Sequence, residues 1–144
     1  MRREATKLYE DRVHLFMKRL QGGMVLAERI PLEATCYASE LPVSFAQRAT
    51  GKGRAIRCGE TWGKEWDSAW FHLTATVPAA WQGKRLVAHL DFNGESLVYS
   101  PTGCPLYGLT NGSVFAEHAS KDVYPIAEAC RGGQAVELWV EAAA

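Results

Sequence analysis

The sequence lacks several features that would point to particular classes of protein. No apolar run approaches the roughly 20 residues that a membrane-spanning helix needs. No apolar stretch follows Met1-Arg2-Arg3-Glu4, so we expect neither a membrane span nor a signal peptide. Sixteen basic residues balance 16 acidic ones, which gives a formal net charge of zero. This balance argues against a nucleic-acid or membrane-surface protein, because both need a positive surface.

Motifs for metal, phosphate and nucleophilic chemistry are also missing. The four cysteines, Cys36, Cys58, Cys104 and Cys130, form no C-x-x-C pair, which excludes the spacing of a zinc ribbon. Without a secretory signal we expect free, buried thiols rather than disulfides. Residues 51–54, Gly-Lys-Gly-Arg, do not have the spacing of a phosphate loop. No serine, cysteine and histidine set suggests a nucleophilic triad.

The first part of the chain predicts one helix followed by irregular structure. Tyr9, Val13, Phe16 and Leu20 follow the 3.6-residue period of an amphipathic helix over residues 6–20. Thr6 is a suitable N-cap, and Gly22-Gly23 is a suitable stop. Proline and glycine punctuate residues 24–60, where we expect only short strands near 44–45 and 55–56. We therefore divide the chain into a helix and irregular arm, residues 1–60, and a β-sandwich, residues 61–144.

The second part of the chain is typical of β-structure. Trp62, Trp66 and Trp70 stand four residues apart and lead into a strict alternation of apolar and polar residues that ends at Pro78. Short strands are predicted at residues 69–77, 85–92, 96–100, 106–107, 123–126 and 135–142. Their alternation predicts a core of Phe71, Leu73, Leu86, Leu90, Leu138 and Val140. The pattern favours a mainly β, antiparallel sandwich or jelly roll behind an N-terminal helix. Because the last strand pattern runs almost to Ala144, we expect the sandwich to be truncated at its C-terminal end.

Several motifs together resemble a known family. They are W-x-x-x-W-x-x-x-W-F-x-L-x-x-x-V-P-x-x-W-x-G-K-x-L from Trp62, the segment Asp91-Phe92-Asn93-Gly94, G-x-P-x-x-G-L from Gly103, and V-E-L-x-V-E-A-A-A from Val136. In this order they resemble the N-terminal, non-catalytic β-domain of the cytosolic-type α-mannosidases of glycoside hydrolase family 38. The resemblance runs from about Leu8 to the last residue. It departs from the family at Tyr99, where the family often carries Trp, and over residues 112–120.

The resemblance implies an accessory domain rather than an active site. The parent enzyme would hydrolyse α-mannosides in oligosaccharides with retention, using a divalent metal such as zinc in a separate catalytic domain. This segment would be a galactose-binding-like jelly roll without a cofactor, a metal ligand or a catalytic residue of its own. Its role would be architectural: packing on the catalytic domain, walling the cleft, or making subunit contacts in a homo-oligomer. The family also implies a cytoplasmic location. The alternative is a free-standing carbohydrate-binding module.

The histidines offer a metal hypothesis and a simpler interpretation. His89-Leu90-Asp91 is an H-x-D motif whose two polar side chains would share one face of a strand. No third ligand follows nearby, which favours a solvent-facing pair over a metal site. His72 and His89 would form an acid–base or metal pair if their strands were neighbours. Two polar residues on the wetter face of a sheet are the simpler interpretation.

The tryptophans and their acidic neighbours offer a sugar hypothesis. Glu60, Glu65 and Asp67 lie among Trp62, Trp66 and Trp70, and sugar sites combine carboxylates for the hydroxyl groups with aromatic rings for the C–H face. The alternative is that the three rings pack in the core or at a domain interface, because such rings bury large areas. We favour packing and keep all three tryptophans as candidate sugar or interface residues.

Overall fold

A computed structural model describes residues 2–20, 27–110 and 120–144. The chain divides into two compact units, Met1–Pro31 and Leu32–Ala144. Among the described residues, no helix combines the length and the apolar character that crossing a membrane requires. The four cysteines are free thiols, as expected, but burial is confirmed only for Cys36 and Cys130, because Cys58 and Cys104 are exposed.

The first unit contains the helix α1, Arg2–Arg19. The predicted helix is confirmed, but it begins at Arg2, so Thr6 lies inside it and is not its N-cap. The predicted stop at Gly22-Gly23 lies outside the described residues. Lys18 and Arg19 occupy the last turn, where positive charge interacts favourably with the helix dipole. The apolar side chains of α1 are about half exposed or more: Leu8, Tyr9, Val13, Leu15, Phe16 and Met17.

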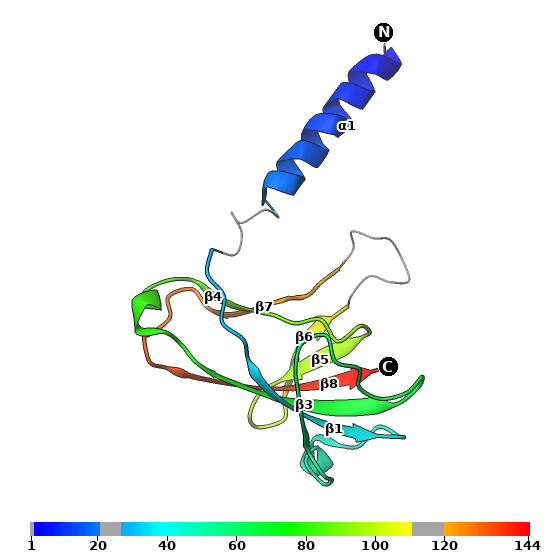
Figure 1. Ribbon diagram of the computed structural model, residues 1–144, viewed down its shortest axis with the longest axis vertical. Helices are drawn as coiled ribbons and strands as arrows, with labels where there is room; N and C mark the ends of the chain where they lie inside the picture. Colours follow the sequence, from blue (N-terminus) through cyan, green and yellow to red (C-terminus); the bar gives the residue numbers. More distant parts are fainter. Residues whose placement is uncertain (1, 21–26, 111–119) are drawn as a thin grey trace. The chain divides into compact units, whose positions relative to one another are not determined.

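The second unit is an antiparallel β-sandwich, as the alternation predicted (Figure 1). The larger sheet has the strand order β2-β1-β3-β8-β5-β6. The strands are β1 Glu33–Ser39, β2 Arg54–Ile56, β3 Ser68–Thr76, β5 Ser96–Tyr99, β6 Pro105–Leu109 and β8 Ala135–Ala143. The smaller sheet pairs β4, Leu86–His89, with β7, Val123–Ala127. Two 3-10 turns, Phe45–Gln47 and Ala79–Trp81, complete the regular structure.

The core forms between the two sheets, and the predicted core residues are all in it. Phe71 and Leu73 of β3 stand opposite Val140 and Leu138 of β8. Leu86 on β4 and Leu90 just after it belong to the same buried cluster, so the smaller sheet supplies the other wall. All six predicted side chains are buried. The period-two pattern therefore identified the inward face of these strands correctly.

The predicted arm at residues 24–60 requires a correction. Residues 33–39 form β1, which pairs with β3 over seven residues, and Leu32–Ala144 is one compact unit. The boundary therefore lies near residue 31 and not at 60. Strand β1 has a weak signal because its inward residues are small: Ala34 and Cys36 stand opposite Leu73 and Phe71. Of the two short strands expected in this region, the one at 55–56 is present as β2, whereas residues 45–47 form a 3-10 turn.

The last strand occupies the middle of the larger sheet. Strand β8 pairs with β3 on one side and with β5 on the other. Among the described strands, the edges of the larger sheet are β2 and β6. A bend at Asn93-Gly94 brings the chain toward β5, and Asn93 adopts a φ of 60° there. A side chain at Gly94 would collide with the carbonyl oxygen of Ala143, so this bend is fitted to the end of β8.

Leu90→Ala should lower the free energy of unfolding by about 2–5 kcal/mol, because it leaves a cavity between the two sheets. Leu90 is 6% exposed, whereas Leu106, the matched control, is 49% exposed. Leu106→Ala should therefore change stability by no more than about 0.5 kcal/mol. Urea unfolding of the two variants measures both values. Equal effects at the two positions would show that Leu90 does not help to close the core.

Candidate functional site: the tryptophans and the outer face of the larger sheet

The three tryptophans that stand four residues apart go to three different environments. Trp62 packs edge-to-face on Phe71, with ring centroids 5.2 Å apart, and its indole N–H donates to the carbonyl of Phe92 at 3.1 Å. Trp70 is 2% exposed and lies on the opposite face of β3. Trp66 is 82% exposed. The three rings therefore form no common platform, and of the three only Trp66 remains fully available to a ligand or partner.

Trp70 belongs to a second aromatic cluster, on the face of the larger sheet that points away from the core. We call it the outer-face cluster; its members are Tyr37, Phe45, Arg48, Trp70, His72, Tyr99 and Trp139. The indole N–H of Trp70 donates to the carbonyl of Val43 at 3.0 Å. Phe45 packs on both Trp70 and Tyr99. These contacts hold the segment around residues 43–48 against the sheet.

An arginine and a histidine cover Trp139 in this cluster. His72 stands opposite Trp139 in the β3–β8 register and stacks on it, with centroids 4.4 Å apart and an interplanar angle of 16°. The guanidinium carbon of Arg48 lies 4.4 Å from the Trp139 centroid and 3.8 Å from that of Phe45. Arg48 Nη1 also donates to the carbonyl of Phe45 at 2.8 Å. Cation–π contacts of this kind stabilise the packed segment.

Two carboxylates at the rim of the cluster bind members of it. The Tyr99 hydroxyl donates to Glu141 at 2.9 Å, and His72 Nε2 lies 2.9 Å from the Glu137 carboxylate. Burial raises the pKa of Tyr99, and the hydrogen bond and negative charge of Glu141 raise it further. Both carboxylates therefore support the packing of the cluster.

The two polar side chains of the H-x-D motif bind different partners. His89 Nε2 lies 3.1 Å from the carboxylate of Asp122, and Asp91 accepts the backbone N–H of Asn93 at 2.8 Å. The described residues contain no group of three or more His, Cys, Asp and Glu that could hold a metal ion. The hypothesis that His72 and His89 lie on neighbouring strands is wrong, because β3 and β4 belong to different sheets.

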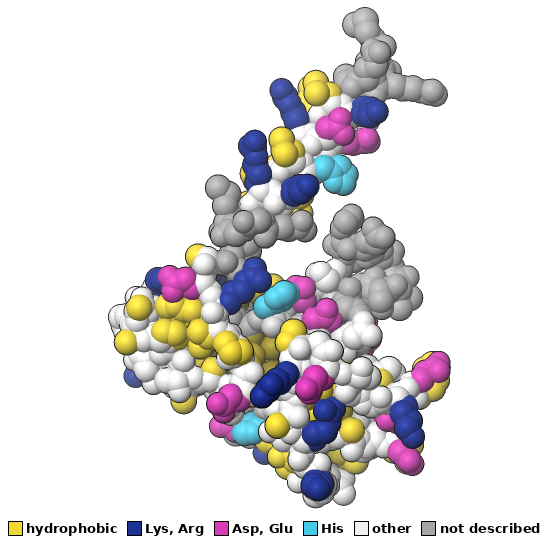
Figure 2. All heavy atoms as spheres, viewed as in Figure 1, with side chains coloured by type: hydrophobic (Ala, Val, Ile, Leu, Met, Phe, Trp, Pro, Cys, Tyr) yellow, Lys and Arg dark blue, Asp and Glu magenta, His cyan; other side chains and the backbone are white. Residues whose placement is uncertain are grey.

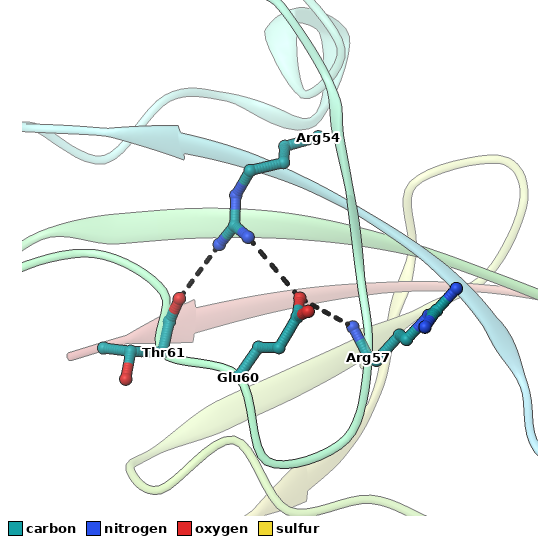
Figure 3. A network of polar contacts seen from close by, with 4 residues as sticks. All are labelled: Arg54, Arg57, Glu60 and Thr61. Carbon is teal, nitrogen blue, oxygen red and sulfur yellow. Dashed lines mark hydrogen bonds and ion pairs between the residues drawn. The ribbon is translucent and has the colours of Figure 1, made fainter.

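Two of the three acidic residues near the tryptophans stabilise their own loop. Figure 3 shows Glu60 at the centre of a network: its carboxylate accepts the backbone N–H of Arg57 at 3.1 Å and lies 3.6 Å from Arg54. Arg54 also donates to the carbonyl of Thr61 at 2.9 Å. Asp67 accepts the backbone N–H of Lys64 at 2.7 Å. Since exposed ion pairs contribute little energy, the network mainly fixes the path of the loop between β2 and β3.

Trp66 occupies a turn with an unusual backbone. Its φ is 73°, in the left-handed region that bulky residues avoid. The turn is tied to the end of β8: Trp66 N donates to the carbonyl of Ala144 at 3.2 Å, and Ala144 N donates to the carbonyl of Asp67 at 2.9 Å. These contacts hold a strained aromatic residue in a position where it buries little surface.

Sequence reasoning missed the outer-face cluster. The signal was present, because Trp139 stands between Glu137 and Glu141 on the polar side of the last strand pattern. Trp70 occupies the corresponding side of β3. Two large aromatic residues on the side of these strands opposite the predicted core indicate a cover over that face. Phe45 and Arg48 cover this face, and both come from a segment without a periodic pattern, so the sequence did not identify them.

Comparison with known proteins gives a consistent set of similarities. Residues 30–144 match the family model described as "Alpha-mannosidase, jelly roll domain". Over 99 residues the chain is 27% identical to alpha-mannosidase G of Dictyostelium discoideum, which covers 69% of this chain and 9% of that protein. It is 35% identical over 57 residues to human alpha-mannosidase 2C1, covering 40% of this chain and 5% of that protein. The mouse protein of the same name is 30% identical over 87 residues, 59% of this chain and 8% of the relative. The chain thus spans less than a tenth of the length of these curated relatives.

Tyr99→Phe should make the protein less sensitive to alkaline pH. A raised pKa means that the folded state holds the phenol proton more tightly than the unfolded state does. The resulting stability is complete below about pH 10, the ordinary pKa of tyrosine, and is lost as the pH rises through the higher folded-state pKa. Thermal melting between pH 8 and 11 should show a smaller fall in Tm for the variant than for the original chain. Parallel curves for the two proteins would contradict this role of Tyr99.

Trp66→Asn should be more stable than Trp66→Leu by about 1 kcal/mol. Left-handed backbone costs roughly 1–2 kcal/mol for ordinary residues, and asparagine tolerates it better. Because Trp66 is largely exposed, both substitutions remove little buried surface and differ mainly in backbone preference. Urea midpoints of the two variants give the difference. A leucine variant as stable as the asparagine variant would show that the turn carries no strain.

Proposed function

The chain belongs to the jelly-roll domain family of α-mannosidases, as its motifs predicted, and on this premise we propose that it is an accessory, non-catalytic domain of an α-mannosidase. The parent enzyme would hydrolyse α-mannosides in oligosaccharides. The divalent metal, zinc or a similar ion, would belong to a separate catalytic domain, and the match of residues 30–144 to a jelly-roll domain supports this division. A cytoplasmic location is part of the proposal, and four free thiols fit a reducing compartment.

The observation that carries this proposal is that five carboxylates of the domain are bonded to groups of the domain itself. A retaining glycosidase needs two carboxyl groups about 5–5.5 Å apart across the glycosidic bond. Here Glu137 and Glu141 bind members of the outer-face cluster, and Glu60 and Asp67 bind backbone N–H groups of their own loop. Asp122 pairs with His89. Carboxylates that support the scaffold in this way are poorly placed to act on a substrate.

The apolar face of α1 supports the architectural part of the proposal. Tyr9, Val13 and Phe16 form a stripe at helical spacing, and each is more than half exposed. Exposed apolar stripes of this kind mark contact surfaces. Such a stripe would serve one of three roles: it would pack on the catalytic domain, form a wall of the cleft, or make contacts between subunits of a homo-oligomer. Residues 30–144 carry the family match, so α1 adds a contact element outside the matched region.

The charge distribution fits a partner that is neither nucleic acid nor a membrane. Figure 2 shows basic and acidic side chains interspersed over the face in view, without a field of one sign. The chain as a whole is neutral. Long-range attraction to a phosphate backbone requires a concentration of positive charge. We therefore propose protein and carbohydrate, and not nucleic acid or lipid, as the partners of this domain.

The isolated chain should not hydrolyse aryl α-mannosides, with or without added zinc or cobalt. The reason is that its described residues contain no group of three or more His, Cys, Asp and Glu that could hold a metal ion, and that Glu137 and Glu141 are bonded to members of the outer-face cluster. An α-mannosidase assayed in parallel under the same conditions serves as the positive control. Turnover that survives purification and disappears in His72→Ala or Glu137→Ala would overturn the non-catalytic role, because these two side chains form a histidine–carboxylate pair 2.9 Å apart.

A further inference from the structure

Trp66 is the most exposed large apolar side chain in the described part of the chain, at 82%. The other tryptophans bury most of their rings: Trp70 and Trp139 are 2% and 7% exposed. Trp62 donates its indole N–H to Phe92. Trp66 thus contributes little to the core, although an indole in water carries a large hydrophobic cost. A functional contact would explain its exposure.

The backbone that carries Trp66 is held at both ends. On one side, Arg54 and Glu60 fix the loop at residues 57–61 (Figure 3). On the other, Asp67 accepts the backbone N–H of Lys64 through its side chain, and its own N–H donates to the carbonyl of Lys64 at 2.9 Å. The backbone bonds between Trp66, Asp67 and Ala144 complete the turn. A turn held in this way loses little further backbone freedom on binding, and this favours affinity.

The neighbours of Trp66 in the turn are charged. Lys64 and Glu65 are exposed, and within the described residues no hydrogen bond or ion pair engages either side chain. The indole is therefore flanked by a cation and an anion that are free to bind polar groups. An apolar protein partner would leave both charges desolvated, which is costly. A ligand with one apolar face and a rim of hydroxyl groups suits this arrangement better.

We propose that the Trp66 turn is a surface binding site for a hexopyranoside. The indole face stacks on the C–H face of the sugar ring. The Glu65 carboxylate accepts a hydrogen bond from one hydroxyl group, and the Lys64 ammonium donates to another. This goes beyond the architectural role proposed above; only the choice of a mannoside as the sugar rests on that proposal. Because a single platform on an open surface offers few contacts, the affinity should be millimolar.

The experiment is a titration of the 144-residue chain with methyl α-mannopyranoside and with an α-linked mannotriose. The indole N–H signals of the tryptophans are followed by NMR. One signal should shift on titration, and it should be the signal that is missing from Trp66→Asn. That variant suits the backbone of the turn, and it should bind at least tenfold more weakly. Trp66→Tyr, which keeps an aromatic face, should retain part of the affinity.

Leu41→Asn is the matched control, because Leu41 is 74% exposed but lies outside the turn. It should bind the mannosides as the original chain does. Absence of binding up to about 100 mM, far above the millimolar range expected, would overturn the proposal. Mannoside binding that is unchanged in Trp66→Asn would also overturn the proposal. Contact with a protein partner would then be the better explanation for the exposure of Trp66. Neither result bears on the non-catalytic role, which the hydrolysis assay tests separately.

Discussion

The pairing of β3 with β8 is the interaction on which the rest of the β-sandwich depends. The two strands match over nine residue pairs at the centre of the larger sheet. On the inner face, this register sets Phe71 and Leu73 against Val140 and Leu138. On the outer face, it sets His72 against Trp139. A slip of one residue would exchange the two faces, so one register specifies both the core and the outer-face cluster.

Much of this fold could be predicted from the sequence, because β3 and β8 carry their own signal. Their alternation is local, and it gave the strand positions to within one or two residues and the inward faces correctly. Strand β1 could not be recognised in the same way. Its inward residues Ala34 and Cys36 are small because Leu73 and Phe71 opposite them are large. The small inward residues of β1 can be understood only once its pairing with β3 is known, so the sequence of β1 alone does not indicate a strand.

The candidate site was less predictable, because its geometry depends on contacts between residues that are distant in sequence. Equal spacing of Trp62, Trp66 and Trp70 suggested one cluster. Trp62 is turned toward the core by a hydrogen bond to Phe92, and the turn at Trp66 is set by Ala144. Both partners lie at least 30 residues away along the chain. Spacing predicts a common face only within a regular helix or strand, and these two tryptophans precede the strand.

The aromatic residues of this domain have two different kinds of surroundings, one packed and one exposed. Trp70 and Trp139 bury their rings against Phe45 and Arg48, and Glu141 and Glu137 hold the rim of that cluster. Both carboxylates thus have a structural role, because one holds a tyrosine and the other a histidine in the packed cluster. Trp66 is the opposite case, because it contributes neither to the core nor to the cluster and sits on a strained backbone. Strain of this kind persists where the surrounding structure enforces it, and it concentrates at binding and catalytic sites. The sheet and its two packed faces therefore provide rigidity, and the exposed Trp66 lies apart from both, on a turn between β2 and β3 whose backbone is bonded to Ala144.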